Sequence, residues 1–435
     1  MISYREAIER LLAPLSVLPS ESCALADAGG RVLADTLTSP LALPSFDHAA
    51  MDGYALKAGA STGGGSEHPV RGSLAAGDAV PGARSSACEI MTGARLPDGL
   101  DAVVAVERTD VLQAQPDGTP RRIRLLDDVT PGQNVRRTGS DVSRGASVLA
   151  AGTVIEPAQI MLLAALGITR LAVVRRPRVA IICTGKELQT GAPSPLRDGQ
   201  IHNSNGPYLV AELRRADAEV VSCVTVDDTV HPYVAALERA VEAGVDMVVS
   251  TGAVSMGRHD FVPDTLRQVG ARLLFHKVAI RPGKPLLAAR LHAGPLVLAL
   301  PGTPMAVAVG ARFFVAPVLR AMAGQGGEPV LHATLASAQH SKPGLRHFLR
   351  AALWLDEQGR LQARPLDRQE PFRIQPFAHA DAWVVLDGHA GDFASGMQVE
   401  IASLGLAATS LSIGAATGGR TDRPSRCAFS RDEPR

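Results

Sequence analysis

The sequence predicts a multidomain α/β plus β protein, in which a central doubly wound α/β domain is joined to smaller domains built mainly from strands. Three observations support this. The chain has 435 residues, which at about 150 residues per domain suggests about three domains. Between about residues 175 and 323, short apolar runs alternate with helical stretches. Elsewhere, short strand-like runs alternate with turns, as expected where 42 glycines and 30 prolines occur.

The α/β segment shows the clearest pattern. The apolar runs VAIIC, EVVSCVTV and DMVVS are each followed by a loop and a helical stretch. The helical stretches are expected at 206–216, 232–243 and 262–269, and an apolar helix is expected near 304–322. Strands that alternate with helices of this length indicate parallel βαβ units in a doubly wound sheet.

The flanking segments complete the expected domain organisation. Ser3 and Glu6 have the spacing of a capping box and predict an N-terminal helix, and a second short helix is expected near 158–166. The runs CEIMTG, DAVVAVE and RRIRLL indicate a small β domain inserted into this N-terminal segment. The predicted domains are 1–46 with 142–174 (elongated α+β), 47–141 (inserted β), 175–325 (α/β), 326–408 (β-barrel-like) and 409–435 (a disordered tail).

Composition excludes several classes of function. The chain has 44 Lys and Arg against 43 Asp and Glu, so it has no basic excess to neutralise nucleic-acid phosphates. Its 4% aromatic content leaves few platforms on which bases could stack. The most apolar stretch, 295–319, is interrupted by three prolines and an arginine, so no membrane span is expected. The five cysteines form no C-x-x-C pair, and the charged N-terminus has no signal-peptide core. These features predict a reduced cytoplasmic protein.

Charged side chains follow the apolar runs of the α/β segment. Glu187 follows the first run and Asp228 follows the second, whereas Asp260 lies after the third. The carboxyl ends of strands in an open α/β sheet form the ligand crevice, where cations bind oxyanions and carboxylates bind Mg²⁺. These residues could also simply cap strand-to-helix turns.

Several loops have both a functional and a structural interpretation. The TGAVSMG loop, with Gly252, Ser255 and Gly257, suits phosphate binding but would serve equally as a tight turn. In IRPGKP, turn chemistry explains the Pro-Gly pair but not the flanking cations Arg281 and Lys284. FDHAAMDGYA at 46–55 is by composition an ordinary turn, and the arginines of NVRRTGSD form either a surface cluster or an anion site.

Six motifs together resemble one family. FDHAAMDGYA, GQNVRRTGSD, CTGKEL, TGAVSMGRHD, KVAIRPGKP and ALPGTP occur here in the order found in molybdopterin molybdenumtransferases, the MoeA proteins and the E domain of gephyrin. The resemblance covers about residues 3 to 405. It implies an Mg²⁺-dependent enzyme that inserts molybdenum from molybdate into adenylylated molybdopterin and releases AMP. It also implies an elongated homodimer of four-domain subunits, with the site between the α/β domain of one subunit and a domain of the other.

The resemblance assigns roles to particular residues. The expected catalytic residues are Asp52, Asp141, Glu187, Asp260, Lys277, Arg281 and Lys284. Glu187, Asp228 and Asp260 are expected to hold Mg²⁺. The residues expected to bind the cofactor and its phosphates are Thr184, Gly185, Thr251, Gly252, Ser255, Gly257, Pro301, Gly302, Arg136, Arg137 and Arg350.

The chain departs from the family pattern mainly on the oxyanion side of the expected site. Thr303 replaces the usual Asn, Ala306 replaces a Ser, and Leu345 replaces an Arg. The stretch 367–377 replaces a Ser-rich segment and offers Arg368 and Arg373 instead. Two alternatives therefore stay open: a non-catalytic protein that binds or delivers the cofactor, and a relative of molybdopterin adenylyltransferase. Such an adenylyltransferase, or an apo-molybdoenzyme, is the expected protein partner.

Overall fold

The computed structural model describes residues 1–59, 62–80, 82–189, 195–254, 260–292, 294–388 and 391–407. The chain divides into two compact units, Ser22–Val173 and the combination of Met1–Glu21 with the chain from Val174 onward. Ser255, Gly257 and the expected disordered tail at 409–435 lie outside the described residues.

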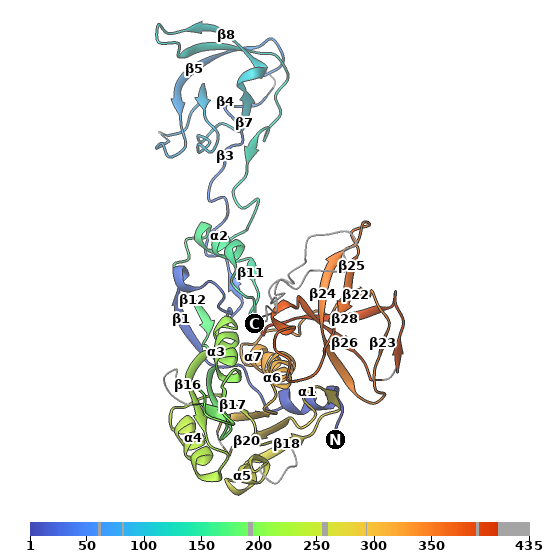
Figure 1. The fold of residues 1–435 in the computed structure, drawn as a ribbon. Coiled ribbons are helices and arrows are strands. Elements are labelled where there is room, and N and C mark those ends of the chain that lie inside the picture. The colour runs from blue at the N-terminus through green and yellow to red at the C-terminus, as the bar shows by residue number, and fades with distance from the viewer. Residues whose placement is uncertain are drawn as a thin grey trace, which may run out of the picture. The chain divides into compact units, whose positions relative to one another are not determined.

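A six-stranded sheet forms the centre of the second of these units (Figure 1). Its strands are β13 (Arg178–Thr184), β16 (Glu219–Val226), β17 (Met247–Thr251), β18 (Arg272–His276), β20 (Leu287–Arg290) and β21 (Leu296–Leu300). The strand order is β16-β13-β17-β21-β20-β18. The first four strands in this order are parallel, whereas β20 is antiparallel to both of its neighbours. This agrees with the predicted doubly wound sheet and adds an antiparallel hairpin at one edge.

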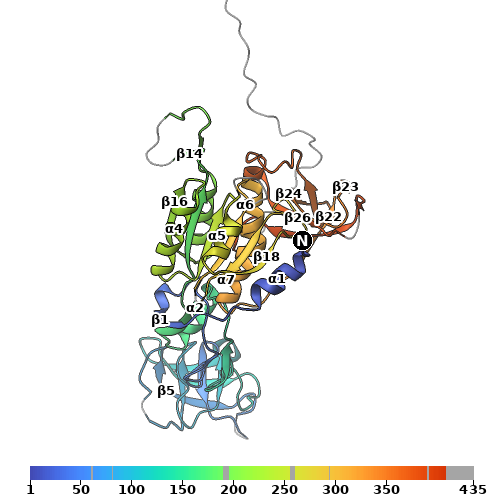
Figure 2. The same ribbon diagram turned by 90° about the horizontal axis from the view of Figure 1, so that it is seen from below.

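Helices cover both faces of the sheet, as Figures 1 and 2 show. One face packs against α1 (Tyr4–Leu12), α3 (Asn205–Arg215), α6 (Pro304–Gly310) and α7 (Ala316–Met322), and the other against α4 (Val230–Glu242) and α5 (Val262–Gln268). Alternate residues of each strand point to opposite faces. Ile181 and Val249 accordingly face α3 and α6, while Ile182 and Val248 face α4.

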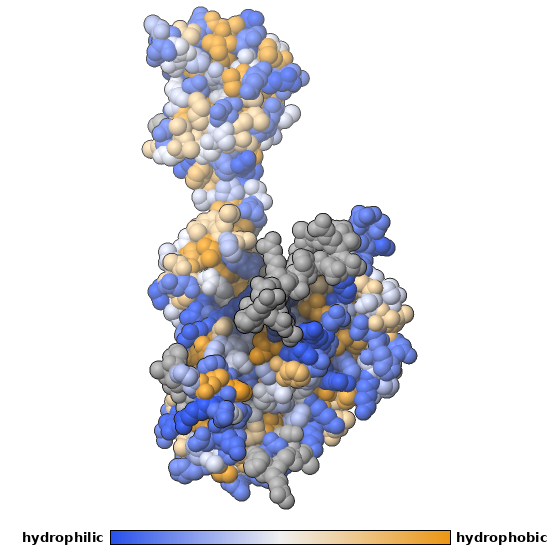
Figure 3. Space-filling view, viewed as in Figure 1, coloured by the Kyte–Doolittle hydropathy of each residue, from blue (hydrophilic) through white to orange (hydrophobic). Residues whose placement is uncertain are grey.

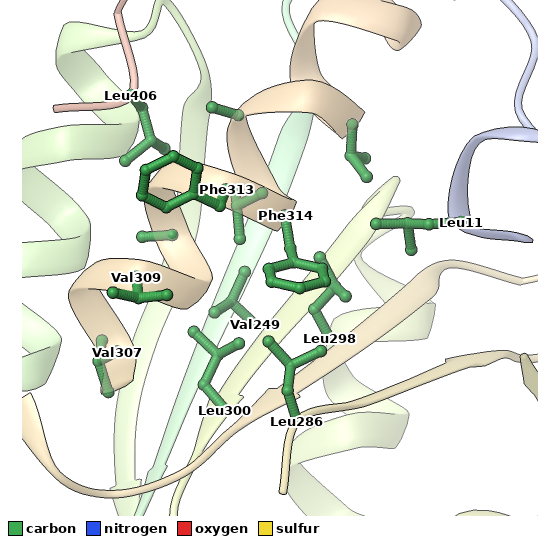
Figure 4. Close-up of a cluster of buried hydrophobic side chains, with 14 of the residues drawn as sticks. Leu11, Val249, Leu286, Leu298, Leu300, Val307, Val309, Phe313, Phe314 and Leu406 are labelled. Atoms are coloured by element: carbon green, nitrogen blue, oxygen red, sulfur yellow. The ribbon is translucent and has the colours of Figure 1, made fainter. Parts of the chain in front are cut away.

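Predicted helix positions are confirmed closely. The Ser3 hydroxyl accepts a hydrogen bond of 3.1 Å from the Glu6 amide, which caps α1. The helix expected at 304–322 begins at Pro304 and ends at Met322, with a π-helical turn at Ala311–Val315 between α6 and α7. Its side chains fill the larger core, where Phe313 and Phe314 lie above Leu298 and Leu300 (Figure 4). By length and composition this helix would suffice to cross a membrane, but 83% of its most apolar window is buried inside the fold.

A closed five-stranded barrel follows the α/β sheet. Its strands are β22 (Leu331–Leu335), β24 (Arg346–Leu355), β25 (Leu361–Pro365), β26 (Ala382–Leu386) and β28 (Gln398–Ser403). Pairing of β24 with β26 closes the barrel around its own apolar core. The short strand β19 (Ile280–Arg281) extends from the α/β domain and pairs in parallel with β24, so it connects the two domains directly.

The unit Ser22–Val173 contains a separate six-stranded sheet. In the order β7-β4-β6-β5-β9-β8, its strands are Ala102–Ala105, Gly53–Leu56, Ala87–Ile90, Glu67–Leu74, Pro120–Leu125 and Thr109–Ala114. The unit also contains α2 (Pro157–Ala165), close to the predicted 158–166, and the short paired strands β3 (His48–Ala49) and β10 (Val135–Arg136). On the faces shown in Figure 3, hydrophilic and hydrophobic residues are interspersed.

Candidate active site

A cavity of about 470 Å³ lies beside the carboxyl ends of β17 and β21. Four segments line it: 253–254 with Asp260 after β17, 280–285 around β19, 301–303 with Ala306 at the start of α6, and Leu345 with Pro371 from the barrel domain. The chain passes from β13 to β16 on one side and then to β17 on the other. The reversal lies between β13 and β17, next to the cavity, and ligands of such sheets bind at the carboxyl ends of the strands near it.

Close backbone packing shapes the floor of this crevice. The Gly252 amide donates to the Leu300 carbonyl at 2.9 Å, and the Thr184 hydroxyl donates to the Thr251 carbonyl at 3.2 Å. A Cβ placed on Gly302 would come within 3.5 Å of the Gly252 Cα. Thr184 and Thr251 are only 5% and 1% exposed. The structure therefore brings these predicted residues together, with the two threonines acting in the packing of the strand ends.

Two of the predicted cations line the cavity. Arg281 and Lys284 are both exposed and flank the turn at Pro282 and Gly283. This turn is held at both ends, because Ile280 and Arg281 pair with β24 and the Val278 amide donates to the Lys284 carbonyl at 2.9 Å. Two positive side chains on a fixed turn form a site suited to an oxyanion.

Lys277, the third predicted cation, is not among the residues that line the cavity. Its backbone has a positive φ of 73° and carries two hydrogen bonds, from the Ile2 amide and to the Leu286 carbonyl. In this structure its backbone joins the N-terminus of the chain to the end of β18.

The predicted carboxylates occupy two places. Asp260 lines the cavity, whereas Glu187 and Asp228 follow β13 and β16 farther along the crevice. The Asp228 carboxylate accepts a hydrogen bond of 3.3 Å from the Lys186 amide, which ties the two loops together. Over the described parts of the chain, no three His, Cys, Asp or Glu side chains are grouped as a preformed metal site. The magnesium site therefore stays a prediction.

In the other unit, Asp52 is held by one residue. The amide and the hydroxyl of Thr92 each donate to its Oδ1 at 2.7 Å. These hydrogen bonds, the amide first, keep the pKa of the exposed Asp52 carboxyl below its ordinary value. Asp52 is therefore ionised at neutral pH, and its Oδ1 atom is held by Thr92.

Arg137 of the same unit donates to Asp47 at 2.7 Å. Hydrogen bonds from Thr138, together with this guanidinium, lower the pKa of Asp47. Arg136 and Asp141 are exposed. Of the two interpretations of NVRRTGSD, the ion pair is present for Arg137, and the exposed Arg136 leaves the anion site open.

Arg350 has a different role from the expected one. Its side chain is only 1% exposed, and its guanidinium donates to the carbonyls of Arg368 and Arg373 and to the Gln369 side chain. Gln369 in turn donates to the Arg350 carbonyl at 2.9 Å. The structure thus assigns Arg350 to holding the 366–373 loop and does not place it in the cavity lining. Its burial explains the difference, since a desolvated guanidinium needs fixed acceptors around it.

Comparisons with known proteins agree with this architecture. The MoeA N-terminal region (domains I and II) matches residues 2–167, a probable molybdopterin-binding domain matches 180–321, and the MoeA C-terminal region (domain IV) matches 332–404. A molybdopterin molybdenumtransferase of Synechococcus elongatus is 37% identical over 93% of this chain and 100% of its own length. The chain belongs to the molybdopterin molybdenumtransferase family. It is therefore a transferase of molybdenum cofactor biosynthesis.

Other members of the molybdenumtransferase family support the same assignment. The Bacillus subtilis molybdopterin molybdenumtransferase is 32% identical over 92% of this chain and 93% of its own. The crystal structure of the molybdopterin biosynthesis MoeA protein from Pyrococcus horikoshii has a TM-score of 0.78 and 28% identity, and covers 92% of this chain and 99% of that one. The expected fold and family are thereby confirmed.

Sequence reasoning missed three residues that contact or pair with residues of the predicted site. Thr92 orients Asp52, Asn205 bonds the Gly302 carbonyl at 2.8 Å, and His347 is buried in register with Arg281. None of the three lies in a motif that carries the resemblance, so no local pattern marked it. Conversely, the positions noted as departures are central, because Thr303, Ala306 and Leu345 all line the cavity.

Proposed function

We propose that this chain inserts molybdenum from molybdate into adenylylated molybdopterin and releases AMP. One observation carries the proposal: the cavity at the carboxyl ends of the strands brings Asp260, Arg281 and Lys284 together. Molybdate and the pyrophosphate link of the pterin are both oxyanions, and these cations suit either of them. The curated relatives are named for this transferase activity.

The charged residues of the cavity have different roles in this proposal. Arg281 binds oxyanion oxygens through a planar fork of donors, whereas Lys284 provides a point charge on a flexible stem. Because both extend from one restrained turn, little backbone freedom is lost when a ligand binds. Asp260 adds a carboxylate that can orient the water needed to break the link to AMP.

The crevice also has a donor set that fits Mg²⁺. Mg²⁺ binds one or two carboxylates, retains several waters and takes further oxygens from substrate phosphates. Glu187 and Asp228 lie on adjacent loops that the Lys186 amide joins, so they suit such a site without a third protein ligand. A bound Mg²⁺ would neutralise charge on the phosphate oxygens of the adenylylated pterin. We include Asp260, which follows β17 and lines the cavity, as the third candidate.

We further propose that the protein is a cytoplasmic homodimer. The resemblance to the family supports a dimer, because it implies that the partner subunit completes the site with residues such as Asp52 and Asp141. The cysteines of the described region, Cys23, Cys88, Cys183 and Cys223, are free thiols, which is typical of reducing compartments. A molybdopterin adenylyltransferase upstream and apo-molybdoenzymes downstream are the protein partners that this reaction would require.

The test is AMP release from adenylylated molybdopterin by the purified protein, with molybdate and Mg²⁺ present. Turnover with formation of active cofactor supports the proposal. Arg281→Ala should weaken substrate binding about 10- to 150-fold, since a charge-assisted hydrogen bond contributes about 1.5–3 kcal/mol. Arg281→Lys should lie between Arg281→Ala and the wild type. Arg272→Ala, on the exposed side of β18, is the matched control.

The departures at Thr303, Ala306 and Leu345 make one other outcome informative. A protein that binds the adenylylated pterin tightly but releases no AMP would be a carrier of the cofactor, because binding without chemistry is the behaviour expected of a delivery protein. Such a result would reject the transferase proposal.

A further inference from the structure

The start of strand β24 places three successive residues in different surroundings. Leu345 lines the cavity. Arg346 points away from it, because its guanidinium pairs with Glu400 and lies 4.8 Å from the ring centre of Tyr4. His347 is 6% exposed and does not line the cavity itself. With Arg350 committed to the 366–373 loop, neither arginine of this strand reaches the cavity.

His347 lies directly beside the anion-binding turn. The parallel pairing of β19 with β24 sets Arg281 opposite His347. The His347 Nε2 atom is buried and has no hydrogen-bond partner among the described residues. A buried polar nitrogen without a partner is unfavourable to a fold, so it needs an explanation, and a role in catalysis or in ligand binding is one.

The groups that face His347 determine its charge. The charged groups that act on it are Arg281 on β19, which pairs with β24, and His340 on the separate strand β23 (Gln339–His340). His340 is itself paired with Asp392 at 2.6 Å, and β26 contributes the apolar Leu386 in register. Burial lowers the pKa of His347, and the Arg281 and His340 charges lower it further. His347 is therefore neutral at pH 7 while the cavity contains no anion.

A bound anion would change the electrostatic surroundings of His347. We propose that His347 is a positioning residue of the oxyanion site, which takes up a proton when a tetrahedral dianion binds beside Arg281. A dianion bound beside Arg281 offsets the positive charge that Arg281 and Lys284 place there, so it removes the repulsion that adds to the effect of burial on His347. The imidazolium then adds a positive charge beside Arg281, opposite in sign to the bound anion.

This inference rests on the proposed function only in assuming that the cavity takes a tetrahedral oxyanion. The direction of the pH dependence of anion binding follows from proton linkage. A group whose pKa is low in the free protein and raised in the complex takes up a proton on binding, so affinity is greatest at low pH and falls as pH rises. Between the two pKa values the decline approaches about tenfold per pH unit for one linked proton.

Sulfate is the probe, because it is tetrahedral and keeps both of its charges between pH 5 and 8. Calorimetric titration of the full-length protein in two buffers of different protonation enthalpy gives the number of protons taken up per sulfate. At a pH between the pKa values of His347 in the free protein and in the complex, we expect the wild type to take up about 0.5 to 1 proton per sulfate. Its affinity for sulfate should fall as pH rises. His347→Asn should bind sulfate with no proton uptake and a flat pH profile. His332→Asn, an exposed histidine of the same barrel, should behave as the wild type does.

Two further measurements keep the test decisive. Proton NMR of the wild-type histidines should show one imidazole whose pKa rises on addition of sulfate. This measurement uses only the wild-type protein, so it does not depend on the folding of a variant. Arg281→Ala should weaken sulfate binding about 10- to 150-fold and should remove this shift at the same sulfate concentration. Equal proton uptake in His347→Asn, or no sulfate binding by the wild type, would overturn the inference. Because sulfate binding needs no turnover, failure of the transferase assay would leave this result interpretable by itself.

Discussion

The side-chain amide of Asn205 donates a hydrogen bond of 2.8 Å to the Gly302 carbonyl. This bond joins the first residue of α3 to the loop after β21, which lines the cavity. Asn205→Ala should loosen this loop without disturbing the core, because the side chain is partly exposed. One neutral hydrogen bond contributes about 0.5–1.5 kcal/mol, so substrate affinity should fall about two- to twelvefold. Calorimetry with the adenylylated pterin measures this, and an unchanged affinity would show that the loop is rigid without Asn205.

Gly252 is constrained both by its conformation and by its neighbours. Its φ is +94°, and a Cβ would meet the Thr184 hydroxyl oxygen at 2.5 Å and the Thr184 carbonyl oxygen at 2.6 Å. Gly252→Ala should lower the free energy of unfolding by about 2–5 kcal/mol, because overpacking of about 1–3 kcal/mol adds to a left-handed strain of about 1–2 kcal/mol.

Gly270 is the matched control, since its φ is +78° but nothing lies within 4 Å of the position that a Cβ would occupy. Gly270→Ala should cost only about 1–2 kcal/mol, from the strain alone. Urea unfolding compares the two variants. Equal losses would mean that the contact with Thr184 is not tight.

The Asp52 carboxylate should titrate at an unusually low pH. Because its pKa is depressed in the folded protein, the Thr92 hydrogen bonds favour folding above the ordinary Asp pKa and lose this effect as pH falls through the depressed value. Thr92→Val removes the hydroxyl donor and should raise the pKa of Asp52 towards its ordinary value. Carbon NMR of the carboxyl group follows the titration. Asp117, whose pKa is lowered by Thr119, should not change, and a shift at both residues would indicate a general rearrangement.

The proposed dimer predicts complementation between inactive subunits. Asp52→Ala and Lys284→Ala homodimers should each have greatly reduced turnover, because each lacks one side of every site. Random exchange of the two makes half of the dimers mixed, and each mixed dimer regains one intact site of two, so about a quarter of wild-type activity should return. A mixture that stays inactive, or light scattering that shows only the 45.4 kDa monomer, would contradict the shared site.

Local sequence patterns predicted the helices of the α/β domain well, because the start of a helix depends mainly on the residues close to it in the chain. The helices α3, α4 and α5 each begin within two residues of their predicted starts, since apolar periodicity and strand-loop-helix alternation are written in short windows of sequence. The antiparallel β20 could not be foreseen in this way. Its direction depends on which neighbours it pairs with, and pairing is a property of the whole sheet.

Side-chain roles were predicted less completely. Arg281 and Lys284 follow from a turn that carries two cations, and the structure places both in the cavity. The burial of Arg350 depends on acceptors from a loop 16 or more residues away in the chain, such as Arg368 and Arg373. His347 needed the pairing of β19 with β24, which joins segments more than 60 residues apart. Charge and residue type indicate which side chains can bind an anion, but only the tertiary contacts determine which remain free to do so.

The central claim is that the cavity beside Arg281 and Lys284 holds the oxyanion of the metal. Crystals soaked with tungstate, a heavy analogue of molybdate, test this directly through the anomalous signal of tungsten. We predict one strong peak within hydrogen-bond distance of the Arg281 guanidinium, and its loss in Arg281→Ala crystals of the same form. A peak at Arg136 in the other unit, with none in the cavity, would contradict the account.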